Sequence, residues 1–80
     1  MNTNNSNKSA TEATRLAIAA TITALEEMLQ TAHAQAAEAV GYIEDGNRNA
    51  AIGTILGLEQ FLADAQALQT AAIALHRRSA

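Results

Sequence analysis

The chain has 80 residues, a formal net charge of −3 at pH 7 and 49% hydrophobic residues. Because single domains usually have about 100–200 residues, this length excludes a two-domain enzyme. The acidic balance disfavours generic binding to nucleic acid or anionic lipid, and no apolar segment approaches the roughly 20 residues that span a bilayer, so no membrane partner is expected.

Alanine dominates the apolar residues and limits the core that one copy can build. Twenty residues are alanine, whose side chain has little surface to bury, and cysteine is absent, so no disulfide can stabilise the chain. Chains this small usually need a disulfide, a metal or another copy to be stable. We therefore expect the protein to be homo-oligomeric.

Residues 1–8 are polar and include four asparagines, so they are predicted to form a disordered N-terminal tail. They contain no apolar stretch of the kind a secretion signal requires, and a cytoplasmic location is expected. Ser9 and Glu12 have the spacing of a capping box. This spacing predicts that the first helix begins at about residue 10.

Between residues 10 and 44, apolar residues recur at alternating spacings of four and three. This spacing is typical of a long helix that packs against another helix. The absence of proline also favours uninterrupted helices. The predicted stripe consists of Ile18, Ile22, Leu25, Leu29, Ala32, Ala36, Ala39 and Ile43.

A polar turn separates this helix from a second one, predicted over about residues 48–78. Gly46 suits the left-handed conformation that ends a helix, and Asn47 or Asn49 suits the cap of the next. The second helix ends in cations, which favour the negative end of the helix dipole. Its predicted stripe consists of Ala51, Ile55, Leu58, Leu62, Ala65, Gln69, Ala72 and His76.

The predicted fold is an all-α, two-helix antiparallel hairpin over residues 9–80. Neither helix can cover all the apolar surface of the other, so we expect two copies to dimerise into a four-helix bundle. Acidic residues gather near the turn, whereas four of the five cations gather at the open end. An antiparallel dimer is therefore preferred, because it brings opposite charges together. These four cations are Lys8, Arg15, Arg77 and Arg78.

No group of residues resembles a nucleophile with its base and oxyanion site, so we expect a protein that is not an enzyme and needs no cofactor. His33 and His76 lie too far apart along the hairpin to share a metal ion, and neither has an acidic residue three or four positions away. No metal site is predicted. A His33–His33 contact between copies, or a polar layer of His76 and Gln69, remains open.

Several residues that lie partly off the stripes are candidates for contacts with another protein. Two of them, Gly53 and Gly57, are four residues apart, a spacing that lets a neighbouring helix approach closely or leaves a shallow groove for a partner's helix or a small ligand. The other candidates are large side chains. They are Leu16, Met28, Tyr42, Leu56 and Phe61.

The surplus of apolar helix surface favours a non-enzymatic, homo-oligomeric protein that acts by protein–protein interaction, as an adaptor, an inhibitor or a regulatory subunit. In its layout alone, the hairpin is similar to the Rop family of plasmid copy-control proteins. This resemblance implies RNA or DNA binding by a dimer, with Lys8, Arg15, Arg77 and Arg78 as the contacts. A third hypothesis is a metal or small-ligand carrier, in which two His33 side chains would have to converge.

Overall fold

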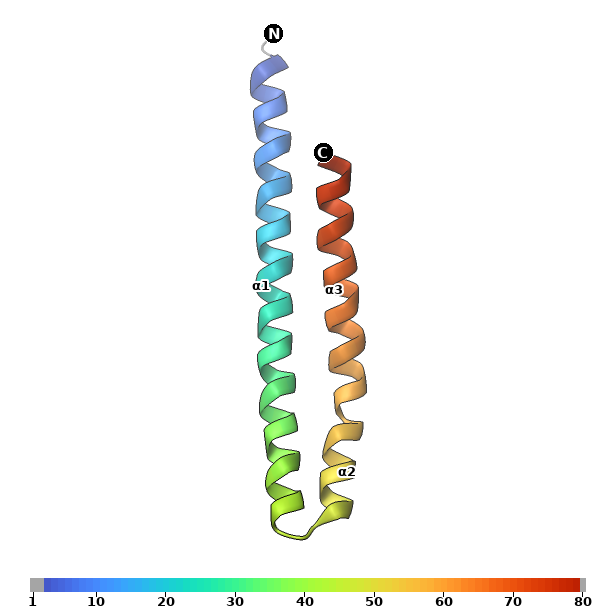
Figure 1. Cartoon of the computed structure of the whole chain (residues 1–80). Coiled ribbons are helices and arrows are strands. Elements are labelled where there is room, and N and C mark those ends of the chain that lie inside the picture. Colours follow the sequence, from blue (N-terminus) through green and yellow to red (C-terminus); the bar gives the residue numbers. More distant parts are fainter. Residues whose placement is uncertain (1–2, 80) are drawn as a thin grey trace.

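The computed structural model describes the backbone of residues 3–79 and the side chains of residues 10–79. Its helices are α1 (Thr3–Glu44), α2 (Arg48–Leu56) and α3 (Leu58–Ser79). α1 runs antiparallel to α2 and α3, which follow one another along nearly the same line (Figure 1). The predicted all-α helical hairpin is confirmed.

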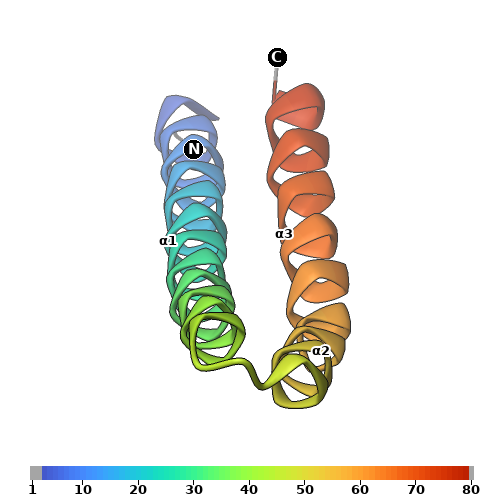
Figure 2. The same cartoon turned by 60° about the horizontal axis from the view of Figure 1, so that its bottom comes forward.

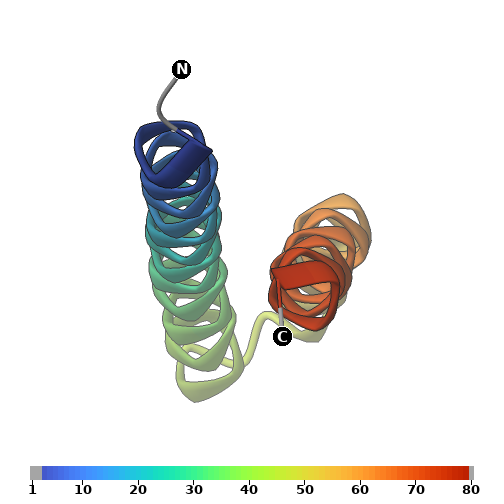
Figure 3. The same cartoon turned by 90° about the horizontal axis from the view of Figure 1, so that it is seen from above.

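The hairpin is a thin rod of 69 × 14 × 14 Å, and no large side chain among residues 10–79 is fully buried. Its radius of gyration is 19.0 Å, whereas a compact chain of this length has a radius of about 12 Å. Its accessible surface is 6030 Å², whereas a folded monomer of 8.4 kDa exposes about 4,600 Å². Figures 2 and 3 show the cause, since both sides of the helix pair are left uncovered by other elements.

α1 begins at Thr3 and not at about residue 10. Ser9 and Glu12 lie inside the helix, so the predicted capping box does not mark its start. No glycine or proline occurs before residue 41, so the sequence contains nothing that would interrupt the helical backbone. The first turns of α1 project beyond the end of α3 (Figure 1). The disorder predicted for residues 1–8 stays a prediction, and residues 1 and 2 lie outside the described residues.

The turn between α1 and α2 has the predicted caps. Gly46 has a φ of 76°, and its amide donates to the carbonyl of Ile43 at 3.0 Å, while the amide of Asn47 donates to the carbonyl of Tyr42 at 2.8 Å. This pair of bonds is a Schellman motif. The Asn47 side chain then accepts a hydrogen bond from the amide of Ala50 at 3.1 Å and caps α2. One short segment therefore ends α1 and begins α2.

The second predicted helix is divided at Gly57, which separates α2 from α3. The amide of Gly57 donates to the carbonyl of Thr54 at 3.2 Å, and Nε2 of Gln35 in α1 donates to the same carbonyl at 2.8 Å. A Cβ on residue 57 would lie 2.5 Å from that Nε2 atom. The glycine therefore leaves room for the only side-chain hydrogen bond that joins α1 to the other arm of the hairpin, α2 and α3, within the described part of the chain.

α1 meets α2 and α3 along a seam that is built around small side chains. The five buried residues among the described side chains are all alanines: Ala32, Ala39, Ala51, Ala65 and Ala72. Half-buried residues continue the seam at spacings of three and four. The seam consists of Thr14, Ile18, Thr21, Leu25, Met28, Ala32, Gln35, Ala39 and Tyr42 from α1, and Ala51, Thr54, Leu58, Phe61, Ala65, Leu68, Ala72 and Leu75 from α2 and α3.

Only every second residue of the predicted stripes lies in this seam. Met28 and Phe61 occupy seam positions, whereas Ile22, Leu29 and Leu62, which were predicted to face the other helix, are about half exposed. The exposed stripe residues are Ile22, Leu29, Ile43, Ile55, Leu62, Gln69 and His76. Each predicted stripe therefore meets the other arm of the hairpin along one edge only, because each helix is rotated about its own axis so that the other edge of its stripe is exposed.

Candidate interaction face

Most of the large exposed apolar side chains lie on one side of the hairpin. Among residues 10–79, ten such side chains are between 42% and 59% exposed. Eight of the ten follow the seam on the same side of the helix pair. We call this surface the open face, and it consists of Ile22, Leu29, Val40, Ile43, Ile52, Ile55, Leu62 and Ile73.

The open face exists because the apolar stripe of each helix is not centred on the seam. Successive residues are rotated by about 100° around a helix axis, so Ile22 lies about 40° from Ile18 in one direction and Thr21 about 60° in the other. Ile18 and Thr21 are seam residues, whereas the stripe runs through Ile18 and Ile22. The stripe of α1 therefore points about 50° away from the neighbouring helix.

α2 has the same offset, since Ala51 and Thr54 are in the seam and Ile55 lies beyond them. Because the arms are antiparallel, equal offsets place both stripes on the same side of the pair. Near the turn, Val40 and Ile43 from α1 line one groove together with residues of α2. The full lining of this groove is Ala36, Ala39, Val40, Ile43, Ala51, Ile52 and Ile55, all of them apolar.

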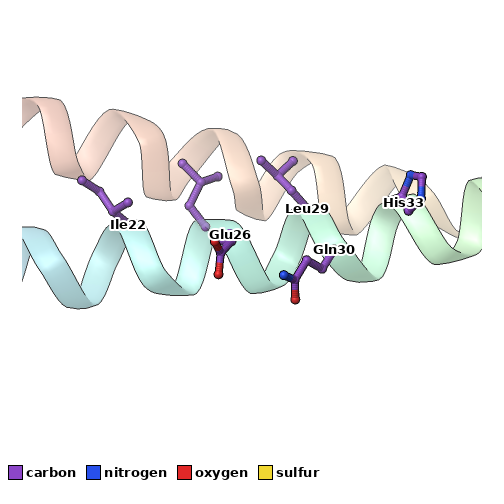
Figure 4. A pocket seen from close by; sticks show the side chains of 6 residues that line it. Ile22, Glu26, Leu29, Gln30 and His33 are labelled. Atoms are coloured by element: carbon purple, nitrogen blue, oxygen red, sulfur yellow. The ribbon is translucent and has the colours of Figure 1, made fainter.

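The open face continues along the middle of the rod. Leu25 and Leu29 of α1 line a second groove with Ala65, Gln66 and Gln69 of α3. A third hollow follows α1 from Ile22 to His33. In Figure 4, Ile22 and Leu29 lean toward α3, while Glu26 and Gln30 point away from it. The apolar surface therefore extends from the turn past the midpoint of the hairpin.

The opposite side of the seam carries much smaller apolar side chains. We call it the small side. It offers methyl groups, one hydroxyl and two carboxylates, but no large aliphatic side chain. Its residues are Ala17, Ala24, Thr31 and Glu38 from α1, and Ala50, Gly57, Asp64 and Ala71 from the other arm. Apolar surface suited to binding another protein is therefore concentrated on the open face.

The candidate partner contacts from the sequence are not brought together. Leu16 and Leu56 are exposed, at 54% and 59%, but they lie outside the open face near opposite ends of the rod. Met28, Tyr42 and Phe61 are half-buried in the seam.

Of the two glycines, Gly57 faces Gln35, and nothing lies within 4 Å of a Cβ built on Gly53. The pair therefore forms no close helix contact within the hairpin. The sequence reading missed the open face as a site because it assigned that face to the seam. The run of Ile and Leu on one edge of the stripe, opposite a run of alanine, was the signal that could have identified it.

Charges differ between the two ends of the rod. At the open end, Arg15 forms an ion pair with Glu12 through Nη2, and its Nε donates to the same carboxylate at 3.0 Å. Hydrogen bonding to Arg15, and then the positive charge of Arg15, lowers the pKa of Glu12. Hydrogen bonding to Glu12, and then the negative charge of Glu12, raises the pKa of Arg15. Arg77 and Arg78 are exposed at the end of α3. The side chain of Lys8 lies outside the described residues.

The turn end carries exposed acidic residues and one cation. Glu44 and Asp45 are exposed beside Arg48. Tyr42 donates a hydrogen bond from its hydroxyl to the Glu38 carboxylate at 3.2 Å. That bond, followed by the charge of Glu38 and by burial, raises the pKa of Tyr42. The turn end is therefore acidic on balance.

The histidines are exposed and well separated, with His33 on α1 and His76 at the end of α3. In the described chain, no three His, Asp or Glu side chains are grouped so that they could hold a metal ion. None of the helices, as far as residues 3–79 define them, has the length and apolar character needed to cross a membrane.

Comparisons with known proteins identify no relative from which a function could be proposed. No protein-family model, no curated protein and no solved structure matches the chain. Function is therefore inferred from the open face, from the seam and from the charges at the two ends of the hairpin.

Proposed function

We propose that the protein is a non-enzymatic, self-associating helical module that acts by protein–protein interaction, as an adaptor, an inhibitor or a regulatory subunit. The observation that carries this proposal is the open face. Soluble monomers seldom expose a large contiguous apolar patch, and such patches usually mark protein interfaces. Eight Ile, Leu and Val side chains on one side of a rod that is two helices thick form a patch of this kind.

Differential capture tests the proposal. The wild-type chain, Ile55→Glu and Ala34→Glu are immobilised in turn and exposed to native lysate that also contains an untagged copy of the chain. Ile55 lies on the open face. Ala34 lies on the outer surface of α1, by which we mean the side of α1 that is directed away from the seam and from the open face. Both residues are exposed. Glutamate has a higher helix propensity than isoleucine, so Ile55→Glu should leave the hairpin intact, which circular dichroism checks.

The wild-type chain and Ala34→Glu should retain the same proteins, and Ile55→Glu should lose them. Retention that is equal for all three chains, or absent for all three, would contradict a role for the open face in protein binding. Identification of the retained proteins distinguishes an untagged copy from a foreign partner.

A second candidate function is RNA or DNA binding, which the exposed Arg77 and Arg78 at the end of α3 favour. Phosphate contacts would make retention of the nucleic acid fall steeply with salt. Filter binding of the wild-type chain and of Arg77→Gln/Arg78→Gln measures this directly. Equal retention of both chains across the salt series would remove the hypothesis.

A further inference from the structure

We propose that a second copy of this chain covers the open face, with its turn lying over the open end of the first copy, and that Leu29 and Leu62 of both copies form the central layer of the resulting four-helix bundle. This inference rests on the proposed function, because it names the occupant of the same face. Four observations support this arrangement: the direction of the apolar stripes, the exposed surface area, the order of large and small side chains, and the charges at the two ends of the rod.

The direction of the apolar stripes fits a four-helix bundle. In a square arrangement each helix has two neighbours at right angles, so its core-facing side points about 45° away from either neighbour. The stripes of the hairpin point about 50° away from the seam. A second hairpin stacked on the open face would therefore face both stripes, and all their residues would lie in one common core.

The amount of exposed surface fits a second copy as well. The hairpin exposes roughly 1,400 Å² more than a folded monomer of its mass. A stable interface of standard size buries about 800 Å² on each partner. The excess is therefore larger than the surface that each of two hairpins has to bury in a stable interface.

The register of the seam fixes which residues lie at the midpoint. Gln35 bonds to Thr54 across the seam, Ala39 and Ala51 line one groove, and Leu25 and Ala65 line another. Opposed residues in these three pairs have numbers that add up to about 90. Leu29 and Leu62 accordingly lie opposite each other, about halfway between the turn and the end of α3. Two fully overlapping antiparallel copies would have their two-fold axis at this layer.

The order of large and small side chains favours the antiparallel arrangement. Interdigitating cores place large residues of one layer against small residues of another element. In an antiparallel stack, Leu25 with Ala65 would meet Ala32 with Leu58 of the second copy. Ile22 with Gln69 would meet Ala36 with Ile55 of the second copy. The first of these layers has two leucines and two alanines. The second has two isoleucines, one alanine and the polar residue Gln69.

A stack with both turns at the same end would be less favourable. Ala39 and Ala51 of the two copies would then form a layer of four alanines, which leaves the core underfilled. Arg15 and His76 would be doubled in a layer at the opposite end. The antiparallel stack instead places these basic residues beside Glu44 and Asp45 of the second copy, and such complementary charges select the orientation of an interface.

Cross-linking between two single-cysteine chains tests the arrangement, since the natural chain has no cysteine. Ile22→Cys and Ala36→Cys are prepared separately and treated with a short bismaleimide, alone and after mixing. Both positions lie on the bundle-facing side of α1 and are separated by roughly 21 Å along the helix. Ala20→Cys and Ala34→Cys are the matched control, with the same spacing on the outer surface of α1.

The proposal expects a mass of two chains by light scattering and a cross-link in the mixture of Ile22→Cys with Ala36→Cys. Each of these variants alone, and the control pair, should cross-link at least tenfold less. Cross-linking of each variant with itself but not in the mixture would show the parallel stack and overturn the proposal. A mass of one chain, or a mass of two chains without the mixed cross-link, would also overturn it. The differential capture of a foreign protein could still succeed in either case, so the two failures are distinguishable.

Discussion

The open face and the small side flank the same seam, yet they differ in the size of their side chains. Ile22, Leu29 and Leu62 stand on one side, where the other side has alanine, threonine or glycine at the equivalent positions. An apolar surface on both sides would let copies stack without limit. An apolar surface on only one side lets a pair of copies close on each other, as symmetric dimers do. This difference between the two sides supports the proposal that two copies close on each other through their open faces.

The largest expected effect comes from placing a carboxylate on each side in turn. Leu62→Glu should weaken self-association at least about 100-fold, because a charge would be buried in the central layer without a partner. Ala71→Glu, on the small side of the same helix, should leave association within about threefold of the wild type. Sedimentation over a dilution series measures both. Equal weakening by the two substitutions would show that the open face is not the interface.

The seam between the two sides should tolerate little added volume. Ala51 is 3% exposed, so Ala51→Leu should overpack the contact between α1 and α2 and destabilise the hairpin by about 1–3 kcal/mol. Ala34→Leu, on the outer surface of α1, should change stability by less than about 0.5 kcal/mol. Urea unfolding at one fixed chain concentration compares them. An Ala51→Leu chain as stable as the wild type would mean that the arms separate easily.

The fold was largely predictable from the sequence because its signals are local. The left-handed conformation of Gly46 and the cap made by Asn47 depend on a few adjacent residues. The spacing of the apolar residues depends on one helix at a time. Both kinds of signal can therefore be recognised in one segment of the sequence, without knowing how the other arm of the hairpin packs against it.

The face of each helix that meets its neighbour was not predictable in the same way. The stripe through Ile18 and Ile22 describes where all apolar contacts of α1 should lie, whereas the seam through Ile18 and Thr21 describes contacts within one hairpin. The stripe and the seam of a helix coincide only when a single neighbouring helix covers the whole stripe. The break at Gly57 was also missed, and the Gln35 side chain that bonds to the Thr54 carbonyl beside it lies 22 positions before Gly57 in the sequence.

The contact between Gln35 and Gly57 provides a smaller test on the small side. Gln35→Ala should cost about 0.5–1.5 kcal/mol, since it removes the hydrogen bond to the carbonyl of Thr54. Gly57→Ala should be close to neutral, because displacement of the Gln35 amide offsets the gain of up to about 1 kcal/mol in helix propensity. Gln35→Ala should then cost little in the Gly57→Ala background. Additive effects in this double-mutant cycle, measured by urea unfolding, would show that the two residues do not interact.

The smallest expected effect is on the titration of Tyr42, the single tyrosine of the chain. The Glu38 carboxylate accepts its hydroxyl proton in a hydrogen bond and raises its pKa, so Glu38→Gln should move the pKa of Tyr42 down toward its usual value. A raised pKa favours the folded state below the usual tyrosine pKa, and this contribution is lost as the pH rises through the folded-state value. Because Glu38 lies on the small side, the tyrosinate absorbance of the wild type should titrate identically at low and high chain concentration. If the pKa of Tyr42 rose with chain concentration, a second copy would have to cover the small side. If the pKa of Tyr42 were the same in Glu38→Gln as in the wild type, the hydrogen bond to Glu38 would not be the cause of the raised pKa.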